Sequence, residues 1–148
     1  MSLPDMAQKR KKICLLICSE VPGVNKGRVN QWLEQMPELN IIAEVEPTFV
    51  FSQPSVNTTP AVWAKLAEAI KKRASQFSGF VVLHGVDNIL YTSSAISFLL
   101  QNLNKPVVFT GSQEQKTSKH QGLKANLINA VQVASFDFAD TCLMFGNR

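Results

Sequence analysis

Side chains that could bind a small polar ligand are found in three separate segments of the sequence. Ser55 lies in the first segment, Asp87 and Asn88 lie in the second, and Ser112 and Gln113 lie in the third. Together these side chains offer hydroxyl groups, amides and a carboxylate, which can recognise the charged ends of a small molecule. Taken singly, each has a simpler structural interpretation, because an aspartate can cap a helix and a serine can form a turn. Whether they act together therefore depends on the elements that position them.

Metal and cofactor chemistry find no support in the pattern of cysteine and histidine. The three cysteines, Cys14, Cys18 and Cys142, are an odd and low count that is typical of a reducing compartment. No cysteine or histidine cluster has the spacing of zinc ligands, so we expect neither a metal nor a cofactor. His84 follows a predicted strand and is expected to be a structural hydrogen-bonding residue, whereas His120 is expected to be exposed in a loop.

The periodicity of the apolar residues predicts strands that alternate with helices. Apolar residues recur at helical spacing in residues 27–36, 60–77, 91–103 and 123–136, the first of these helices being ended by Pro37. Short apolar or alternating runs predict strands at residues 12–18, 41–46, 49–51, 79–83, 106–109 and 141–145. Such alternation predicts an α/β fold with a mainly parallel sheet that is flanked by helices.

This architecture predicts where a ligand would bind. In open parallel sheets, ligands bind outside the carboxyl ends of the strands. The loops at residues 19–25, 84–88 and 111–121 follow predicted strands, and the loop at residues 53–59 precedes a predicted helix. We therefore expect these four loops, and the polar residues in them, to converge at one edge of the sheet.

Length and charge point to a single domain without a nucleic-acid or membrane partner. The chain has 148 residues and a net charge of +4, and residues 9–12 alone supply four positive charges. Residues 1–11 are thus expected to be a flexible basic lead-in, and no aromatic residues are interleaved with the basic ones as a nucleic-acid surface would require. No apolar run approaches the ~18 residues of a membrane helix, and the short apolar run after the basic residues lacks a signal-peptide cleavage site. We expect a cytoplasmic protein.

Two longer segments resemble the bacterial-type L-asparaginase family. Residues 80–98, FVVLHGVDNILYTSSAISF, are similar to the family segment built around His-Gly-Thr-Asp-Thr. Residues 103–113, LNKPVVFTGSQ, are similar to its Asn-Lys-Pro-Val-Val strand and Gly-Ser-Gln turn. Two helix starts also match, one at Thr59, Pro60 and Trp63 and one at Gly122, Asn126 and Leu127. The resemblance runs from about residue 12 to 147 in the family's order, and it implies the asparaginase N-terminal fold with a left-handed crossover.

The resemblance also implies where the family's catalytic groups would fall. The family hydrolyses an amide through a threonine nucleophile, which a carboxylate and a lysine assist. The nucleophile position is Val21 and the second threonine position is Val86, while the neighbouring carboxylate is kept as Asp87 and Ser55 is expected to contact the α-carboxylate of a substrate. Valine has nearly the shape of threonine but no hydroxyl. The family's lysine would follow Arg148, so we expect a single asparaginase N-terminal-like domain, residues 1–148, that is truncated after its last strand.

These substitutions predict an asparaginase-like protein that is catalytically inactive and retains a vestigial pocket for a small amino acid such as Asn, Asp, Gln or Glu. The pocket would be lined by Ser55, Asp87, Asn88, Ser112 and Gln113. An alternative is an active amidohydrolase, converting L-asparagine to L-aspartate and ammonia, that uses other residues or a second chain. A third hypothesis is a truncated product or gene remnant. Because family members form dimers and tetramers, we also expect a homo-oligomer or pairing with a second chain.

Overall fold

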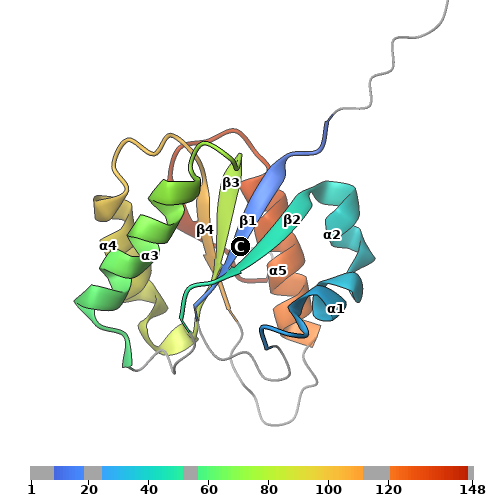
Figure 1. The fold of residues 1–148 in the computed structure, drawn as a ribbon, viewed down its shortest axis with the longest axis horizontal. Coiled ribbons are helices and arrows are strands. Elements are labelled where there is room, and N and C mark those ends of the chain that lie inside the picture. The colour runs from blue at the N-terminus through green and yellow to red at the C-terminus, as the bar shows by residue number, and fades with distance from the viewer. Residues whose placement is uncertain (1–8, 19–24, 52–56, 112–120, 147–148) are drawn as a thin grey trace, which may run out of the picture.

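The computed structural model describes residues 9–18, 25–51, 57–111 and 121–146. Within these ranges, five parallel strands form one sheet in the order β2-β1-β3-β4-β5 (Figure 1). The strands are β1 (Lys12–Ile17), β2 (Glu44–Phe49), β3 (Gly79–Leu83), β4 (Val107–Thr110) and β5 (Thr141–Leu143). The predicted α/β fold with a parallel sheet is therefore confirmed.

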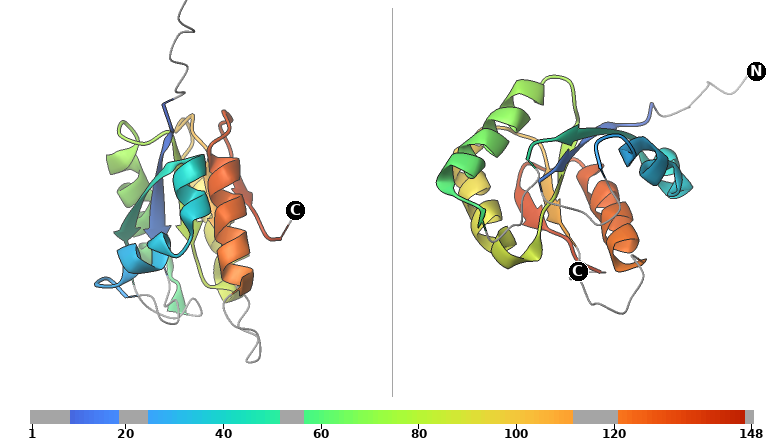
Figure 2. Two further views of the ribbon diagram at one scale, coloured as in Figure 1. Left: turned by 90° about the vertical axis from the view of Figure 1, so that its right-hand side faces the viewer. Right: turned by 60° about the horizontal axis from the view of Figure 1, so that its bottom comes forward.

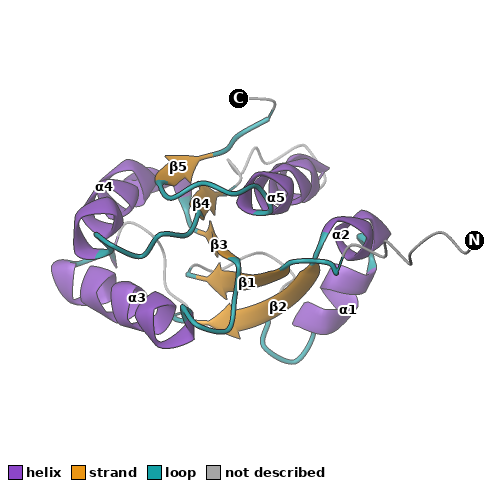
Figure 3. Ribbon diagram, turned by 90° about the horizontal axis from the view of Figure 1, so that it is seen from above, coloured by secondary structure: helices purple, strands orange, loops and turns teal. Residues whose placement is uncertain are grey.

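Helices cover both faces of the sheet and make three layers (Figure 3). One face carries α1 (Val29–Glu34), α2 (Pro37–Ile42) and α5 (Gln121–Ala134). The other face carries α3 (Pro60–Arg73) and α4 (Ile89–Leu99). Figure 2 shows the same arrangement from the side of α1, α2 and α5 and from the lower edge of Figure 1. The sheet therefore has an apolar core on each of its faces.

The two cores explain why the central strands are largely apolar. In β1, Ile13, Leu15 and Ile17 belong to the core under α5, while Cys14 and Leu16 belong to the core under α3 and α4. Alternate side chains of a strand point to opposite faces, so in a strand covered on both faces most positions are apolar and a polar residue needs a hydrogen-bond partner. Burial also raises the pKa of the Cys14 and Cys18 thiols, which fits a structural role for both.

The connection from β4 to β5 is left-handed. The steps from β2 to β3, β3 to β4 and β4 to β5 all move in the same direction across the sheet. The first two cross the face of α3 and α4 and are right-handed, whereas α5 crosses the opposite face (Figures 1 and 3). Right-handed connections are almost universal between parallel strands. The exception agrees with the crossover that the family resemblance implies.

The region around Pro37 differs from the sequence prediction. Pro37 begins α2 instead of simply ending the preceding helix, because proline suits the first helical position, where no backbone N–H is needed. The chain stays helical to Ile42, so the strand predicted at residues 41–46 begins at Glu44 and runs to Phe49. Pro47 is tolerated there because β2 is an edge strand of the described sheet. The separate strand predicted at residues 49–51 was wrong, since Val50 and Phe51 lie outside any strand.

The helix ends also shift by a few residues. α4 starts at Ile89 and ends at Leu99, whereas residues 91–103 were predicted. The helix does not reach residue 103 because Asn102 and Asn104 adopt left-handed backbone conformations that a helix cannot include. α3 ends at Arg73 and not at residue 77. Lys105 Nζ donates to the Phe77 carbonyl at 2.8 Å and also to the Ala74 carbonyl, and thereby satisfies acceptors just beyond this helix. None of the helices within the described ranges has the length and apolar character needed to span a membrane.

Candidate functional site at the carboxyl ends of the strands

The carboxyl ends of the central strands lie side by side at one edge of the molecule. Ile17 pairs with Leu83, and Leu83 pairs with Thr110, so β1, β3 and β4 end in register. The helices α3, α4 and α5 all begin at this edge, which is the lower edge in Figure 1 and is turned toward the viewer in Figure 2, right. This is the edge at which the sequence predicts that a ligand would bind to a parallel sheet.

Three of the predicted site residues are placed at this edge. Val86, Asp87 and Asn88 form the one-turn 3-10 helix η2 (Val86–Asn88), which follows β3 and leads directly into α4. The other predicted positions, Val21, Ser55, Ser112 and Gln113, lie outside the described residues, as does His120. Their convergence with η2 remains a prediction.

Val86 presents methyl groups at the position where the family resemblance implies a threonine. Its side chain is half-buried. A methyl group placed on the α-carbon of Gly111 would lie 3.5 Å from Val86 Cγ1, so Val86 sits beside the end of β4. Neither methyl group of valine can attack a carbonyl carbon or donate a hydrogen bond. The position is therefore shaped like that of a threonine but has no nucleophile.

Asp87 is exposed and lies close to the start of α4. The backbone N–H groups at a helix start favour a nearby negative charge. The residue at the N-cap position of α4 is Asn88 and not Asp87, which weakens the interpretation of Asp87 as a simple helix cap. A carboxylate in this place can form a charged hydrogen bond with an ammonium group or can receive a proton.

His84 lies at the junction of β3 and η2 and is almost completely buried, with 1% of its surface exposed. Its Nδ1 donates to the carbonyl of Gly85 at 2.6 Å, while Nε2 has no hydrogen-bond partner within the described part of the chain. The ring packs against the rings of Phe51 and Phe109, with centroids 6.5 and 6.4 Å away. Burial lowers the pKa of His84, and the hydrogen bond to Gly85 opposes this only in part.

Gly111 allows β4 to approach β3 closely at the site. A methyl group on its α-carbon would lie 2.3 Å from the carbonyl oxygen of His84, a distance that no side chain tolerates. The Gly111 carbonyl accepts a hydrogen bond of 2.7 Å from Asn126 Nδ2, and Asn126 Oδ1 accepts one of 2.8 Å from the Gly146 N–H. Asn126 thus ties the chain after β4 to the chain after β5.

The role of Asn126 was not predicted. In the sequence this residue is only part of a family motif, yet it stands beside Leu127 and one turn from Ala130 on a largely apolar helix. A polar residue that interrupts the buried stripe of a helix is the signal that could have identified it, since such a group needs a partner when packed against a sheet.

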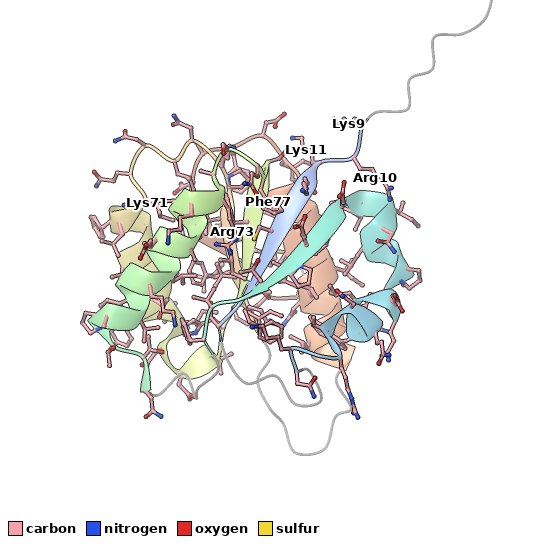
Figure 4. All side chains as sticks on the ribbon, in the orientation of Figure 1. Lys9, Arg10, Lys11, Lys71, Arg73 and Phe77 are labelled. Atoms are coloured by element: carbon pink, nitrogen blue, oxygen red, sulfur yellow. The ribbon has the colours of Figure 1, made fainter. Side chains whose placement is uncertain are left out.

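The positive charge of the chain gathers at the opposite edge, where the strands begin. Figure 4 labels five basic residues toward this edge, Lys9, Arg10, Lys11, Lys71 and Arg73. Part of this charge is paired within the molecule, because Lys11 pairs with Asp137 and the neighbouring Lys12 has its Nζ 3.0 Å from Glu46. No group of three His, Cys, Asp or Glu side chains in the described ranges could hold a metal ion.

Comparison with known proteins gives consistent matches along this chain. A family model described as Asparaginase, N-terminal, matches residues 19–148. The chain is 38% identical over 128 residues to L-asparaginase 1 of Escherichia coli, which covers 82% of this chain and 37% of that protein. It is 39% identical over 116 residues to a Glutamyl-tRNA(Gln) amidotransferase subunit of Saccharolobus islandicus, covering 78% of this chain and 25% of that protein.

A solved structure shows the same fold. The crystal structure of L-asparaginase I from Vibrio cholerae superposes with a TM-score of 0.81 at 34% identity and covers 94% of this chain. The match covers 45% of that protein, so the chain spans less than half the length of each of these relatives.

Proposed function

This chain belongs to the asparaginase family, and from that premise we propose that it binds a small amino acid without hydrolysing an amide by itself. The relatives with activities in their names are more than twice as long as the matched region, so their activities are not transferred to this chain. The proposal rests on the residues at the carboxyl edge of the sheet.

The observation that carries the proposal is the valine at position 86. Family resemblance implies a threonine hydroxyl directly before the carboxylate, and this structure has methyl groups there, beside Gly111 and next to Asp87. A carboxylate activates a hydroxyl by removing its proton, and valine has no such proton. Removing one member of a cooperating catalytic set typically costs ~10⁴–10⁶ in rate. The same change at Val21, outside the described residues, points in the same direction.

Ligand binding is less affected than catalysis by these substitutions. Threonine and valine have nearly the same volume, so the space for a ligand is kept. The Asp87 carboxylate can pair with an ammonium group, and we expect Ser55, Asn88, Ser112 and Gln113 to contact the carboxylate and amide groups of the ligand. Charged hydrogen bonds of this kind are the stronger class. The ligands that fit are Asp, Asn, Glu and Gln.

Calorimetry and an ammonia assay together test the proposal. We expect wild-type protein to bind at least one of L-Asp, L-Asn, L-Glu and L-Gln and to release no ammonia from L-Asn or L-Gln. The double variant Val21→Thr, Val86→Thr should bind the same ligand more tightly, since each restored hydroxyl can satisfy a polar group of the ligand, worth about 1–3 kcal/mol. Turnover should remain far below that of an asparaginase.

Two results would contradict the proposal. Robust ammonia release by the wild-type chain alone would show an active amidohydrolase. Absence of binding by both the wild type and the double variant would show that no amino-acid pocket remains.

A second candidate function is a component that becomes active with a partner chain. One relative is named as a subunit of an amidotransferase, and Asp87 keeps the family's carboxylate. Ammonia release that appears only after a second protein is added would favour this function.

A further inference from the structure

We propose that His84 is a positioning residue that holds the Val86–Asn88 turn in register with the ends of β2 and β4. The inference rests on the proposed function, because the turn that it positions carries Asp87 and Asn88. His84 itself contacts no ligand, since it is buried beneath this edge.

The first support is the hydrogen bond from the ring to the turn. A carbonyl oxygen only accepts, so the Nδ1 that lies 2.6 Å from Gly85 O must carry a proton. Gly85 is the residue before Val86, and its backbone is extended as the chain leaves the sheet. The ring thereby fixes the carbonyl at which the chain changes direction from β3 into η2.

The second support is the packing of the ring between two other strand ends. Phe51 follows β2, and Phe109 lies near the end of β4. Phe51 meets the histidine ring at a nearly perpendicular angle of 85°, and Phe109 at 54°. Aromatic pairs at such distances favour tilted and edge-to-face geometries, which restrict the orientation of both rings.

The third support is the backbone of the same residue. The His84 N–H donates to the Thr110 carbonyl at 2.9 Å, and the His84 carbonyl faces the α-carbon of Gly111 at close range. One residue therefore contacts the ends of β2 and β4 and the start of η2. Binding groups must be held within about 0.5 Å of their working positions by supporting contacts, and His84 provides such support for Asp87.

Two substitutions separate the contributions of the ring and of its hydrogen bond. His84→Asn keeps an N–H donor near Gly85 O and removes the aromatic ring, while His84→Phe keeps a ring and removes the donor. Phe77→Leu is the control. Phe77 is buried in the core that also contains Phe109, and its ring contacts that of Phe80. It lies at the opposite end of the sheet from His84, as Figure 4 shows. Each protein is compared with the wild type by hydrogen–deuterium exchange and by calorimetry with the four amino acids.

We expect both His84 variants to increase amide exchange in residues 50–51 and 85–88, which adjoin the ring contact and the hydrogen bond, while residues 12–17 stay protected. Both should weaken binding of the amino acid that the wild type prefers by about tenfold, as expected from losing one hydrogen bond or ring contact. Phe77→Leu should leave the affinity within about twofold and should increase exchange near residues 74–80.

Other patterns would overturn the inference. His84 is merely structural if both of its variants bind as tightly as the wild type, or if their exchange rises uniformly along the chain. The inference is also overturned if Phe77→Leu weakens binding as much as the His84 variants do. If the wild type binds none of the four amino acids, the proposed function fails, and the exchange pattern alone still decides whether His84 positions the turn.

Discussion

Single atoms decide the chemistry that this site can perform. At position 86, replacement of a hydroxyl by a methyl group keeps the shape of the side chain and removes its only reactive atom. Gly111 shows the converse, because one added carbon there would meet the carbonyl of His84. The site is therefore tolerant of a change in polarity at Val86 and intolerant of a change in volume at Gly111.

We predict that Gly111→Ala destabilises the protein by about 1–3 kcal/mol or more, since the new methyl group would lie 2.3 Å from a backbone oxygen. Gly122→Ala is the matched control. Gly122 lies in α5, where a methyl group would meet nothing within 4 Å, and alanine favours a helix by up to about 1 kcal/mol. Urea unfolding of both variants measures the difference. Equal stability of the two variants would contradict the close approach of β3 and β4.

The lowered pKa of His84 predicts a pH dependence of stability. An unfolded chain takes up a proton as the pH falls through about 6.5, while the folded chain resists protonation because the ring is buried. The free energy of unfolding should therefore be highest above about pH 6.5 and should fall as the pH drops toward the lower folded pKa. Among described residues at the adjacent strand end and turn, the other titratable groups are Cys18 and Asp87.

Urea unfolding between about pH 8 and 5 checks this prediction. His84→Asn should lose the dependence. His120→Gln should retain it, and this control matters because the chain has two histidines. Identical pH profiles for the wild type and His84→Asn would show that another group causes the change.

At the scale of elements, a buried polar contact joins the two helices that cover one face of the sheet. Trp63 Nε1 of α3 donates to Thr92 Oγ1 of α4 at 3.0 Å, and Thr92 is fully buried. α4 follows η2 directly, so this contact also fixes the helix that begins at the candidate site.

A double-mutant cycle of Trp63→Phe and Thr92→Val should give a coupling energy of about 1 kcal/mol, because either change removes the same hydrogen bond. Ser93→Ala is the control partner, since Ser93 Oγ bonds within its own helix to the Leu90 carbonyl. Its coupling to Trp63→Phe should be near zero. A coupling that is no larger for Thr92 than for Ser93 would show that the contact does not hold α3 against α4.

For the whole molecule, the outer surface of α4 bears on the predicted self-association. No charged residue occurs in α4, and Leu90, Tyr91 and Phe98 are 66%, 68% and 73% exposed. Phe98 follows Tyr91 by seven positions and Leu90 by eight, which is about two helical turns, so all three side chains lie on one side of the helix. Contiguous exposed apolar side chains are typical of interaction sites.

We predict a mass above the 16.4 kDa of one chain by light scattering at micromolar concentration. Phe98→Glu should return the protein to a monomer by placing a charge in the contact. Ile41→Glu should not, although Ile41 is 79% exposed, because it lies on α2 across the sheet from α4. A monomeric wild type would remove the support for self-association.

The α/β architecture and the family could both be predicted from the amino-acid sequence. Strands that are covered on both faces are mostly apolar, and helices that are covered on one face are apolar at every third or fourth position. These local rules predicted β1, β3 and the helices α1, α3, α4 and α5 to within a few residues, but they missed α2, where a strand was expected from residue 41. The resemblance to the family's consecutive motif, and not periodicity, pointed to Val86 and Asp87 shortly after β3.

The surroundings of the candidate site could not be predicted from the sequence and became visible in the folded chain. Phe51, His84 and Phe109 are far apart in the sequence, and so are Gly111 and Asn126, yet each set meets because three strands end in register. Pro37 shows the same limit on a smaller scale, since a proline can end one helix or begin the next and the choice depends on how α1 and α2 pack. Local periodicity tells which side of an element is buried, whereas the partner on that side is set by the packing of the whole chain.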